Sequence, residues 1–239
     1  MSEAFFRTLA RQAAARYPAR DRFARHYAYG KLTRDPAFRY LLARGSIPHG
    51  ARVLDLGCGQ GLLATLLAVA RERYAKGEWP ADWAPPPNPA ALRGIELMPR
   101  DVERARQASG SEAEFVAGDI RSTEFGTADA VVILDVLHYI DFPAQHAVLK
   151  RVRAALGGGG VLLLRVGDAS ASLRFRYTMW VDRAVMALRG HRLERLYCKP
   201  VALWRRELEA LGFGVEAIPM SEGTGFANVL LVARYDSSR

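Results

Sequence analysis

Residues 53–61 read Val53-Leu54-Asp55-Leu56-Gly57-Cys58-Gly59-Gln60-Gly61, a short apolar run that ends in three alternating glycines. The run predicts a buried parallel strand, and the apolar segment that begins at Leu62 predicts a helix behind the turn. Glycine adopts backbone angles barred to other residues, and the first N–H groups of a helix have no partner within it. The turn therefore indicates a site for a nucleotide-like cofactor.

The spacing of the glycines separates two classes of cofactor. A dinucleotide site requires G-x-G-x-x-G, in which the third glycine packs the helix against the strand. Here the sixth position is Leu62 and the pattern is G-x-G-x-G. Asp55 lies at the strand end, where a carboxylate suits a ligand that carries an ammonium or sulfonium better than one that carries phosphates. The alternative is an ordinary structural turn.

The string D-L-G-C-G-Q-G resembles motif I of the class I S-adenosylmethionine-dependent methyltransferases. The resemblance implies an α/β three-layer sandwich with a doubly wound, seven-stranded, mostly parallel sheet whose last strand is antiparallel. It also implies S-adenosylmethionine as cofactor, S-adenosylhomocysteine as product and no metal ion. Cofactor contacts are implied at the turn residues Gly57, Cys58, Gly59 and Gly61.

The rest of the chain alternates strands and helices, as in a parallel sheet covered on both faces. Strands are predicted at 52–56, 92–96, 113–116, 128–134 and 161–166, and helices at 62–74, 99–108 and 143–156. The four glycines 157–160 are expected to end the last of these helices before the fifth strand. A helix at 200–211 and an edge hairpin of strands 214–219 and 227–235 complete the core.

Two helical covers and a proline-rich insertion surround this core. The N-terminal cover is predicted as helices at 3–18, 21–29 before Gly30, and 35–45, and the insertion at 76–89 as a surface loop whose two tryptophans pack locally. We expect one domain over 1–239, made of the N-terminal cover 1–50, the cofactor-binding core 51–166, a second helical cover 167–199, and the terminal helix and strands 200–239.

Acidic residues end four successive predicted strands: Asp55, Glu96, Asp119 and Asp135. Open α/β sheets bind ligands at the carboxyl ends of their strands, although any single carboxylate could merely cap a helix. The resemblance implies that Glu96 accepts hydrogen bonds from the ribose hydroxyls and that Asp135 faces the methionine end. It further implies that Asp119 accepts from the adenine amino group and that the ring packs on Leu97, Met98 and Ile120.

The loop after the fourth strand carries the candidate catalytic residues. His138 lies three residues beyond Asp135 and is the best candidate for a general base, because histidine titrates near neutral pH. Tyr139 could orient the acceptor or stack on it. In the alternative reading, His138 only caps the loop or contacts the cofactor. Reserve candidates on the two covers are His26, Tyr27, Tyr29, His191 and Tyr197.

The net charge of +9 is unevenly distributed along the 239 residues. Residues 1–50 and 171–206 each carry +7, which leaves −5 for the remainder. Two explanations account for this charge distribution equally well. In the first, the arginines are solvated side chains on amphipathic helices. In the second, the two basic segments cover the active site and receive an anionic acceptor or an acidic carrier protein. In the second reading Tyr27, Tyr29, His138, Arg174, Arg176 and Tyr177 bind the acceptor, and charge reversal at Arg174 and Arg176 weakens its use.

The residues after the fourth strand narrow the class of acceptor. Residues 135–138 read Asp-Val-Leu-His, without the Asn/Asp-Pro-Pro-Tyr/Phe typical of base-amino methyltransferases and without a cysteine nucleophile. The sequence is most similar to the small-molecule branch, and residues 22–38 more loosely resemble bacterial enzymes of aryl-polyene or fatty-acid-like pigment synthesis. We expect a small-molecule or carrier-bound acceptor, aromatic, phenolic or acyl and anionic. An RNA or tRNA methyltransferase and an inactive S-adenosylmethionine-binding regulatory subunit are the alternatives.

The cysteine count and the hydropathy of the chain predict the cellular environment of the protein. Two cysteines, Cys58 and Cys198, are too few for a disulfide framework or a cysteine-rich metal site. No apolar run reaches membrane-spanning length, and arginines interrupt the N-terminus too often for a signal-peptide core. We therefore expect a cytoplasmic protein with no membrane partner. The sequence leaves its oligomeric state open.

Overall fold

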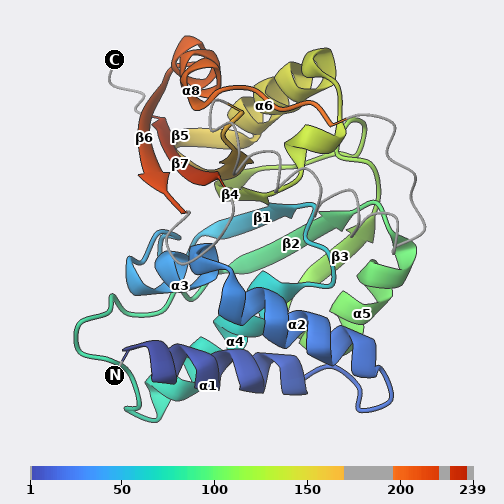
Figure 1. The fold of residues 1–239 in the computed structure, drawn as a ribbon, viewed down its shortest axis with the longest axis vertical. Coiled ribbons are helices and arrows are strands. Elements are labelled where there is room, and N and C mark those ends of the chain that lie inside the picture. Colours follow the sequence, from blue (N-terminus) through green and yellow to red (C-terminus); the bar gives the residue numbers. More distant parts are fainter. Residues whose placement is uncertain (1, 170–195, 221–226, 236–239) are drawn as a thin grey trace. The chain divides into compact units, whose positions relative to one another are not determined.

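The computed structural model describes residues 2–169, 196–220 and 227–235 (Figure 1). Their strands form a seven-stranded sheet in the order β3-β2-β1-β4-β5-β7-β6, flanked by helices. β1 pairs with β2 and β2 with β3 in parallel, whereas β7 runs antiparallel to both β5 and β6. The predicted fold class is therefore confirmed. The strands are β1 Arg52–Leu56, β2 Ala91–Glu96, β3 Glu114–Ala117, β4 Ala128–Leu134, β5 Leu156–Gly167, β6 Phe213–Pro219 and β7 Asn228–Tyr235.

The chain divides into two compact units, residues 1–131 and 132–239. In the first unit β1, β2 and β3 lie side by side (Figure 1), with Leu56 in register with Ile95 and Glu96 with Ala117. Helix α4, Leu62–Ala75, is buried at every residue from 62 to 70. A helix segment that is apolar on all sides is a buried one, so residues 62–70 of α4 lie inside this unit, whereas residues 71–75 are half-buried or exposed. The prediction of a single domain over 1–239 stays a prediction.

Three helices of the N-terminal cover precede the sheet: α1 Ser2–Ala15, α2 Arg22–Arg34 and α3 Pro36–Ala43. Asp21 caps α2 by accepting the Ala24 N–H at 2.9 Å, and Asp35 caps α3 by accepting the Ala37 N–H at 3.0 Å. Helix α2 continues through Gly30, beyond the end predicted from the sequence. One glycine is tolerated there because Leu32, in the following turn, is fully buried.

The proline-rich insertion packs on α1 through its two tryptophans. Trp83 is 8% exposed, and its ring makes edge contacts with the rings of Phe5 at 5.8 Å and Trp79 at 5.6 Å. The indole N–H of Trp79 donates to the Ala84 carbonyl at 2.9 Å. These contacts confirm the predicted local packing of the tryptophans.

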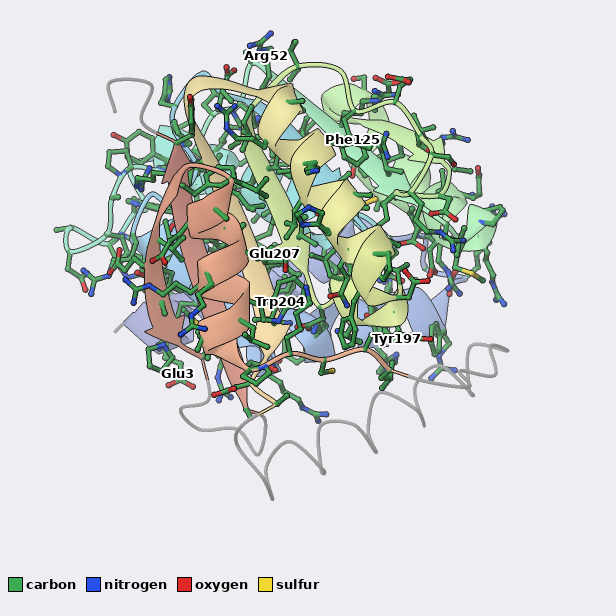
Figure 2. The ribbon with its side chains drawn as sticks, turned by 90° about the horizontal axis from the view of Figure 1, so that it is seen from above. Glu3, Arg52, Phe125, Tyr197, Trp204 and Glu207 are labelled. Atoms are coloured by element: carbon green, nitrogen blue, oxygen red, sulfur yellow. The ribbon has the colours of Figure 1, made fainter. Side chains whose placement is uncertain are left out.

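The second unit contains η2 Leu137–Tyr139, α6 Phe142–Ala155, β5, α8 Val201–Ala210, β6 and β7. α6 ends at Ala155 and β5 begins directly after it at Leu156, so the prediction that glycines 157–160 precede a strand that starts at Val161 is wrong. Glycines 157–159 are exposed, Gly159 has a φ of 86°, and the pairing of β5 with β7 begins only at Val161. Figure 2 shows Trp204 and Glu207 on α8, where His146 Nδ1 of α6 lies 2.9 Å from Glu207 Oε1.

The second basic cover falls mainly on residues 170–195, which lie outside the described residues.

Helix α5, Pro99–Ser109, and the 3-10 turn η1, Gly110–Glu112, complete the elements of the first unit. Among the described residues, no helix combines the length and the apolar character needed to cross a membrane.

Candidate functional site

The glycine turn between β1 and α4 adopts the conformation that its sequence predicts. Gly57, Gly59 and Gly61 have φ angles of 71°, 55° and 79°. A Cβ at Gly61 would also lie 2.9 Å from the Cβ of Ala105 and 3.0 Å from the ring of Phe115. Gly61 is therefore required both by its backbone angle and by the space around it.

Glu96, at the end of β2, is fixed against this turn. Its Oε2 accepts the Gly59 N–H at 3.0 Å, and its Oε1 accepts the Met98 N–H at 3.0 Å. The main chain of the turn is tied to the same strand, because the Gly57 N–H donates to the Ile95 carbonyl at 2.7 Å. The carboxylate predicted to receive the ribose thus lies directly at the turn.

Asp55 adds a second carboxyl group on β1. It is 6% exposed, and burial, together with the nearby charge of Glu96, raises its pKa to about 7. Burial and the charge of Glu96 both disfavour the ionised form of Asp55, whereas a cationic ligand would favour that form. The two strand ends consequently form an electrostatic environment that favours a positively charged ligand.

The remaining residues predicted at the turn have different surroundings. Cys58 is 8% exposed, and burial raises the pKa of its thiol, which disfavours the reactive thiolate. Its Sγ lies close enough to β2 that a Cβ at Gly94 would approach it to 2.6 Å. Leu97, immediately after Glu96, is 58% exposed and offers an apolar side chain at this edge of the unit.

Asp119, after β3, is engaged by Arg121. The Arg121 N–H and Nε both reach Oδ1, at 2.8 and 3.0 Å, and Nε lies 2.8 Å from Oδ2. These hydrogen bonds lower the pKa of Asp119, which therefore stays ionised. The Arg121 side chain is 58% exposed, and Ile120 between the two is 7% exposed. The adenine contacts assigned to Asp119 and Ile120 stay predictions.

Asp135, at the end of β4 in the second unit, is paired with a residue that the sequence reasoning missed. Arg165 Nε donates to Asp135 Oδ1 at 2.8 Å, and Arg165 Nη2 also donates to Oδ2. Asp135 has φ 60°, the single positive value of a non-glycine residue in the described part of the chain. The available signal was the lone arginine within the apolar strand 161–166.

The loop that carries His138 and Tyr139 is held by Gln145 and Tyr197. The rings of His138 and Tyr139 are 4.1 Å apart between centroids, and the His138 carbonyl accepts the Tyr197 N–H at 2.9 Å. Gln145 Nε2 donates to the carbonyls of Leu137, Ile140 and Tyr197 at 3.0, 3.1 and 2.8 Å. The structure thus brings two predicted candidates, His138 and Tyr197, together in the second unit.

Predicted acceptor residues on the N-terminal cover lie on α2. Tyr27 is half-buried and stacks on Phe23, with centroids 6.2 Å apart and planes at 13°. Tyr29 is also half-buried, whereas His26 is exposed and its Nδ1 lies 2.7 Å from the Arg22 carbonyl. The other predicted residues, Arg174, Arg176, Tyr177 and His191, lie outside the described residues.

Part of the positive charge of the N-terminal cover is engaged within the first unit. Arg16 pairs with Glu72 and with Glu112, the latter at 3.0 Å. Arg25 donates to the Tyr17 carbonyl at 2.8 Å. Across the described ranges, no group of three or more histidine, cysteine, aspartate or glutamate side chains has an arrangement that could hold a metal ion.

Comparison with known proteins adds family and fold relationships. A family model described as a methyltransferase domain matches residues 23–218. A carboxy-S-adenosyl-L-methionine synthase of Chromohalobacter salexigens is 35% identical over 129 residues, 52% of this chain and 43% of the relative. A ubiquinone biosynthesis O-methyltransferase of Xanthomonas campestris is 30% identical over 131 residues, 52% of this chain and 46% of the relative. The matched region spans about half the length of these curated relatives.

A solved structure is similar over nearly the whole chain. Magnesium protoporphyrin IX methyltransferase from Synechocystis PCC 6803, with bound S-adenosylhomocysteine, has a TM-score of 0.59 and 21% identity, and the match covers 90% of this chain and 88% of that one. At this identity the likeness concerns the fold alone.

Proposed function

We propose that this chain, which belongs to the methyltransferase domain family, transfers a methyl group from S-adenosylmethionine to a small-molecule or carrier-bound acceptor. Its resemblance to the class I S-adenosylmethionine-dependent methyltransferases is confirmed by that match and by the order of its seven strands. The observation that carries the proposal is the carboxyl pair of Asp55 and Glu96 at the glycine turn. Glu96 accepts the Gly59 N–H at 3.0 Å while Asp55 is buried beside it.

The residues of the first unit fit this cofactor. Asp55 and Glu96 favour a cation, and the crowding around Gly61 excludes a side chain at that position of the turn. When bound, S-adenosylmethionine supplies a methyl group on a positively charged sulfonium, open to in-line attack. Asp55 would hold the cationic methionine end and Glu96 the ribose hydroxyls. Leu97, Met98 and Ile120 would pack on adenine, and Asp119 would accept a hydrogen bond from its amino group. The contact of Asp135, in the second unit, with the methionine end stays a prediction.

His138 is our candidate for the general base. A phenol or hydroxyl acceptor must lose its proton near neutral pH, and an imidazole nitrogen can accept it. The half-buried His138 lies in a loop that Gln145 fixes through three carbonyls. Tyr139, whose ring is 4.1 Å from that of His138, would orient the acceptor or stack on it. The protein otherwise has to position the acceptor and exclude water.

The acceptor is proposed to be aromatic, phenolic or acyl, and anionic. One relative supports this proposal, because its name, ubiquinone biosynthesis O-methyltransferase, indicates methyl transfer to a small molecule. The net charge of +7 in each basic segment would favour an anionic acceptor or an acidic carrier protein. The resemblance of 22–38 to enzymes of pigment synthesis, and a cytoplasmic location, stay predictions.

A second candidate function follows from the 35% identical relative, which is named carboxy-S-adenosyl-L-methionine synthase. In that case the cofactor itself would be the molecule that is altered. Mass spectrometry of the small molecule released on denaturing freshly purified protein separates the two. A carboxylated S-adenosylmethionine supports the synthase, whereas S-adenosylmethionine or S-adenosylhomocysteine supports methyl transfer.

Calorimetry with S-adenosylmethionine, S-adenosylhomocysteine and NAD tests the cofactor, and product release on phenols, acyl-carrier proteins and tRNA tests the acceptor. We expect both S-adenosyl ligands to bind and phenols or acyl carriers to be methylated. Binding of NAD without S-adenosylmethionine would overturn the proposal. Methylation of tRNA alone would favour the RNA alternative, and binding without turnover would favour a regulatory subunit.

A pair of histidine variants tests the base. His138→Ala should lower turnover by about a hundredfold or more, because general bases contribute on that order, and should leave S-adenosylhomocysteine binding unchanged. His146→Ala, in the same unit and with a side chain 48% exposed, is the matched control and should retain turnover. Full turnover in His138→Ala removes this residue as the base.

A further inference from the structure

Gln60 is a buried polar residue within the glycine turn that the proposed function does not use. It stands between Gly59 and Gly61 and is 1% exposed. Its side-chain Nε2 donates to the Ala24 carbonyl at 2.8 Å, and its own carbonyl accepts the Tyr17 hydroxyl at 2.8 Å. The turn is therefore joined to the N-terminal cover through both the side chain and the main chain of one residue.

The two partners of Gln60 are themselves firmly held. Tyr17 is 0% exposed, and burial raises the pKa of its phenol, so the hydroxyl keeps the proton that it donates. Ala24 is 0% exposed, and its N–H donates to Asp21 Oδ1 at 2.9 Å. Arg104 Nε of α5 donates to Asp21 Oδ2 at 2.8 Å, which links the start of α2 to α5. Gln60 is thus anchored to two fully buried residues, Ala24 in α2 and Tyr17 in the connection between α1 and α2.

Three glycines give a turn little intrinsic backbone preference, and within this turn the Gly61 N–H donates to the Cys58 carbonyl at 3.0 Å. Glycine loses more conformational freedom on folding than any other residue, so such a turn samples many states unless contacts outside it select one. A binding loop that is already in its bound conformation pays less of this cost when the ligand arrives. The anchors of Gln60 act on the segment between two glycines with φ 55° and 79°.

We propose that Gln60 is a positioning residue that preorganises the glycine turn for its cofactor by tying it to the N-terminal cover. The inference rests on the proposed function for the identity of that cofactor. It assigns the N-terminal cover a role in cofactor affinity in addition to any contact with the acceptor. Because coupling between two sites is reciprocal, a ligand that orders the turn must also protect the backbone of α2.

Gln60→Met tests the proposal, because methionine has nearly the same length but cannot donate a hydrogen bond. The change leaves the Ala24 carbonyl without this donor and should weaken S-adenosylhomocysteine binding about tenfold, measured by calorimetry. Gln107→Met is the matched control, since Gln107 is exposed and its Nε2 donates to Glu103 Oε1 at 2.7 Å on the surface of α5. Its affinity should equal that of the wild type.

Tyr17→Phe removes the second anchor and tests it independently. It keeps the buried ring and deletes the hydroxyl that donates to the Gln60 carbonyl, so we expect a several-fold loss of affinity. If Gln60→Met does not fold, Tyr17→Phe decides the question. If Gln60→Met folds and binds S-adenosylhomocysteine with wild-type affinity, the proposal is overturned. If Gln60→Met does not fold, wild-type affinity in Tyr17→Phe overturns it. A purely structural role would lower the melting temperature without changing affinity.

Hydrogen exchange of the ligand-free protein separates this inference from the proposed function. Gln60→Met should raise exchange in residues 57–65 and 22–28 together, and Gln107→Met should raise it in neither. A wild type that binds no S-adenosylhomocysteine would overturn the proposed function. The exchange measurement still tests the coupling between the turn and α2 in that case. If hydrogen exchange in Gln60→Met rises only in residues 57–65, or does not rise, the coupling is overturned.

Discussion

Arg165 Nε donates to Asp135 Oδ1 at 2.8 Å from the interior of β5, and a second hydrogen bond joins the same two side chains. The Arg165 side chain is 1% exposed, while that of Asp135 is 25% exposed. Asp135 also has φ 60°, where a non-glycine residue needs support from its surroundings. The pair therefore fixes the direction in which the chain leaves β4 toward η2.

The unequal burial of the pair predicts unequal costs of breaking it. Asp135→Asn leaves a buried guanidinium without its counter-charge and should cost about 3–5 kcal/mol of unfolding free energy. Arg165→Met should cost less, about 1–3 kcal/mol, because water can reach the remaining carboxylate. Urea unfolding of the two variants measures both values, and a larger loss in Arg165→Met would contradict this reasoning.

Arg205→Met is the matched control for this pair. Arg205 and Glu209 form an exposed pair in the same unit at 2.8 Å, with side chains 53% and 46% exposed. Exposed pairs contribute little, so the urea midpoint of this variant should stay close to that of the wild type.

Cofactor binding should be linked to the protonation of Asp55. Burial first, and the charge of Glu96 second, raise the pKa of Asp55 to about 7, and a cationic ligand favours the ionised form. Affinity for S-adenosylmethionine should therefore rise as the pH increases from 6 to 8, with release of a proton on binding below pH 7. Calorimetry in phosphate and in Tris, which differ in ionisation enthalpy, measures that proton. Identical binding enthalpies in the two buffers would contradict the linkage.

The same pKa has the opposite consequence for the stability of the ligand-free protein. In the unfolded chain aspartate titrates near pH 4, so between about pH 4 and 7 the folded state binds this proton more tightly. The contribution of Asp55 to stability is thus lost as the pH rises through that window. In Asp55→Asn this part of the pH dependence of the melting temperature should disappear.

Gln145 should determine how firmly residues 196–199 are held to the His138 loop. It is 0% exposed and donates to the carbonyls of Leu137, Ile140 and Tyr197. Gln145→Met removes these donors and should cost about 2–3 kcal/mol, since buried carbonyls then lose their partners. Hydrogen exchange should increase at Tyr197, whose N–H donates to the His138 carbonyl at 2.9 Å. Unchanged exchange there would show that the Tyr197 bond holds the segment alone.

Trp83→Ala tests whether the proline-rich insertion stabilises the first unit. The ring is 8% exposed and contacts the rings of Phe5, Phe6 and Trp79. Its removal should cost about 3–5 kcal/mol, as for other large buried aromatics. Trp79→Ala, at a half-buried position, should cost less. A negligible loss in Trp83→Ala would mean that the insertion is a surface appendage.

The fold followed from features that act over short distances along the chain. The apolar run 128–134 is a strand of those bounds, and the glycines of residues 57–61 adopt the positive φ angles that their spacing indicates. The helix ends were less predictable. Helix α2 passes through Gly30, because Leu32 in the following turn is buried, and β5 includes glycines 157–160, which the local preference of glycine does not predict.

The sequence by itself determined the alternation of strands and helices, the glycine turn, and acidic residues at the ends of β1 to β4. The tertiary structure decided which of these carboxylates has which partner. Glu96 is fixed by the N–H groups of Gly59 and Met98, Asp135 by Arg165, and Asp119 by Arg121. It also decided that Gln60 joins the turn to Tyr17 and Ala24. Backbone preferences and hydrophobic periodicity are local and can be read along the chain, whereas burial and hydrogen-bond partners depend on residues distant in sequence.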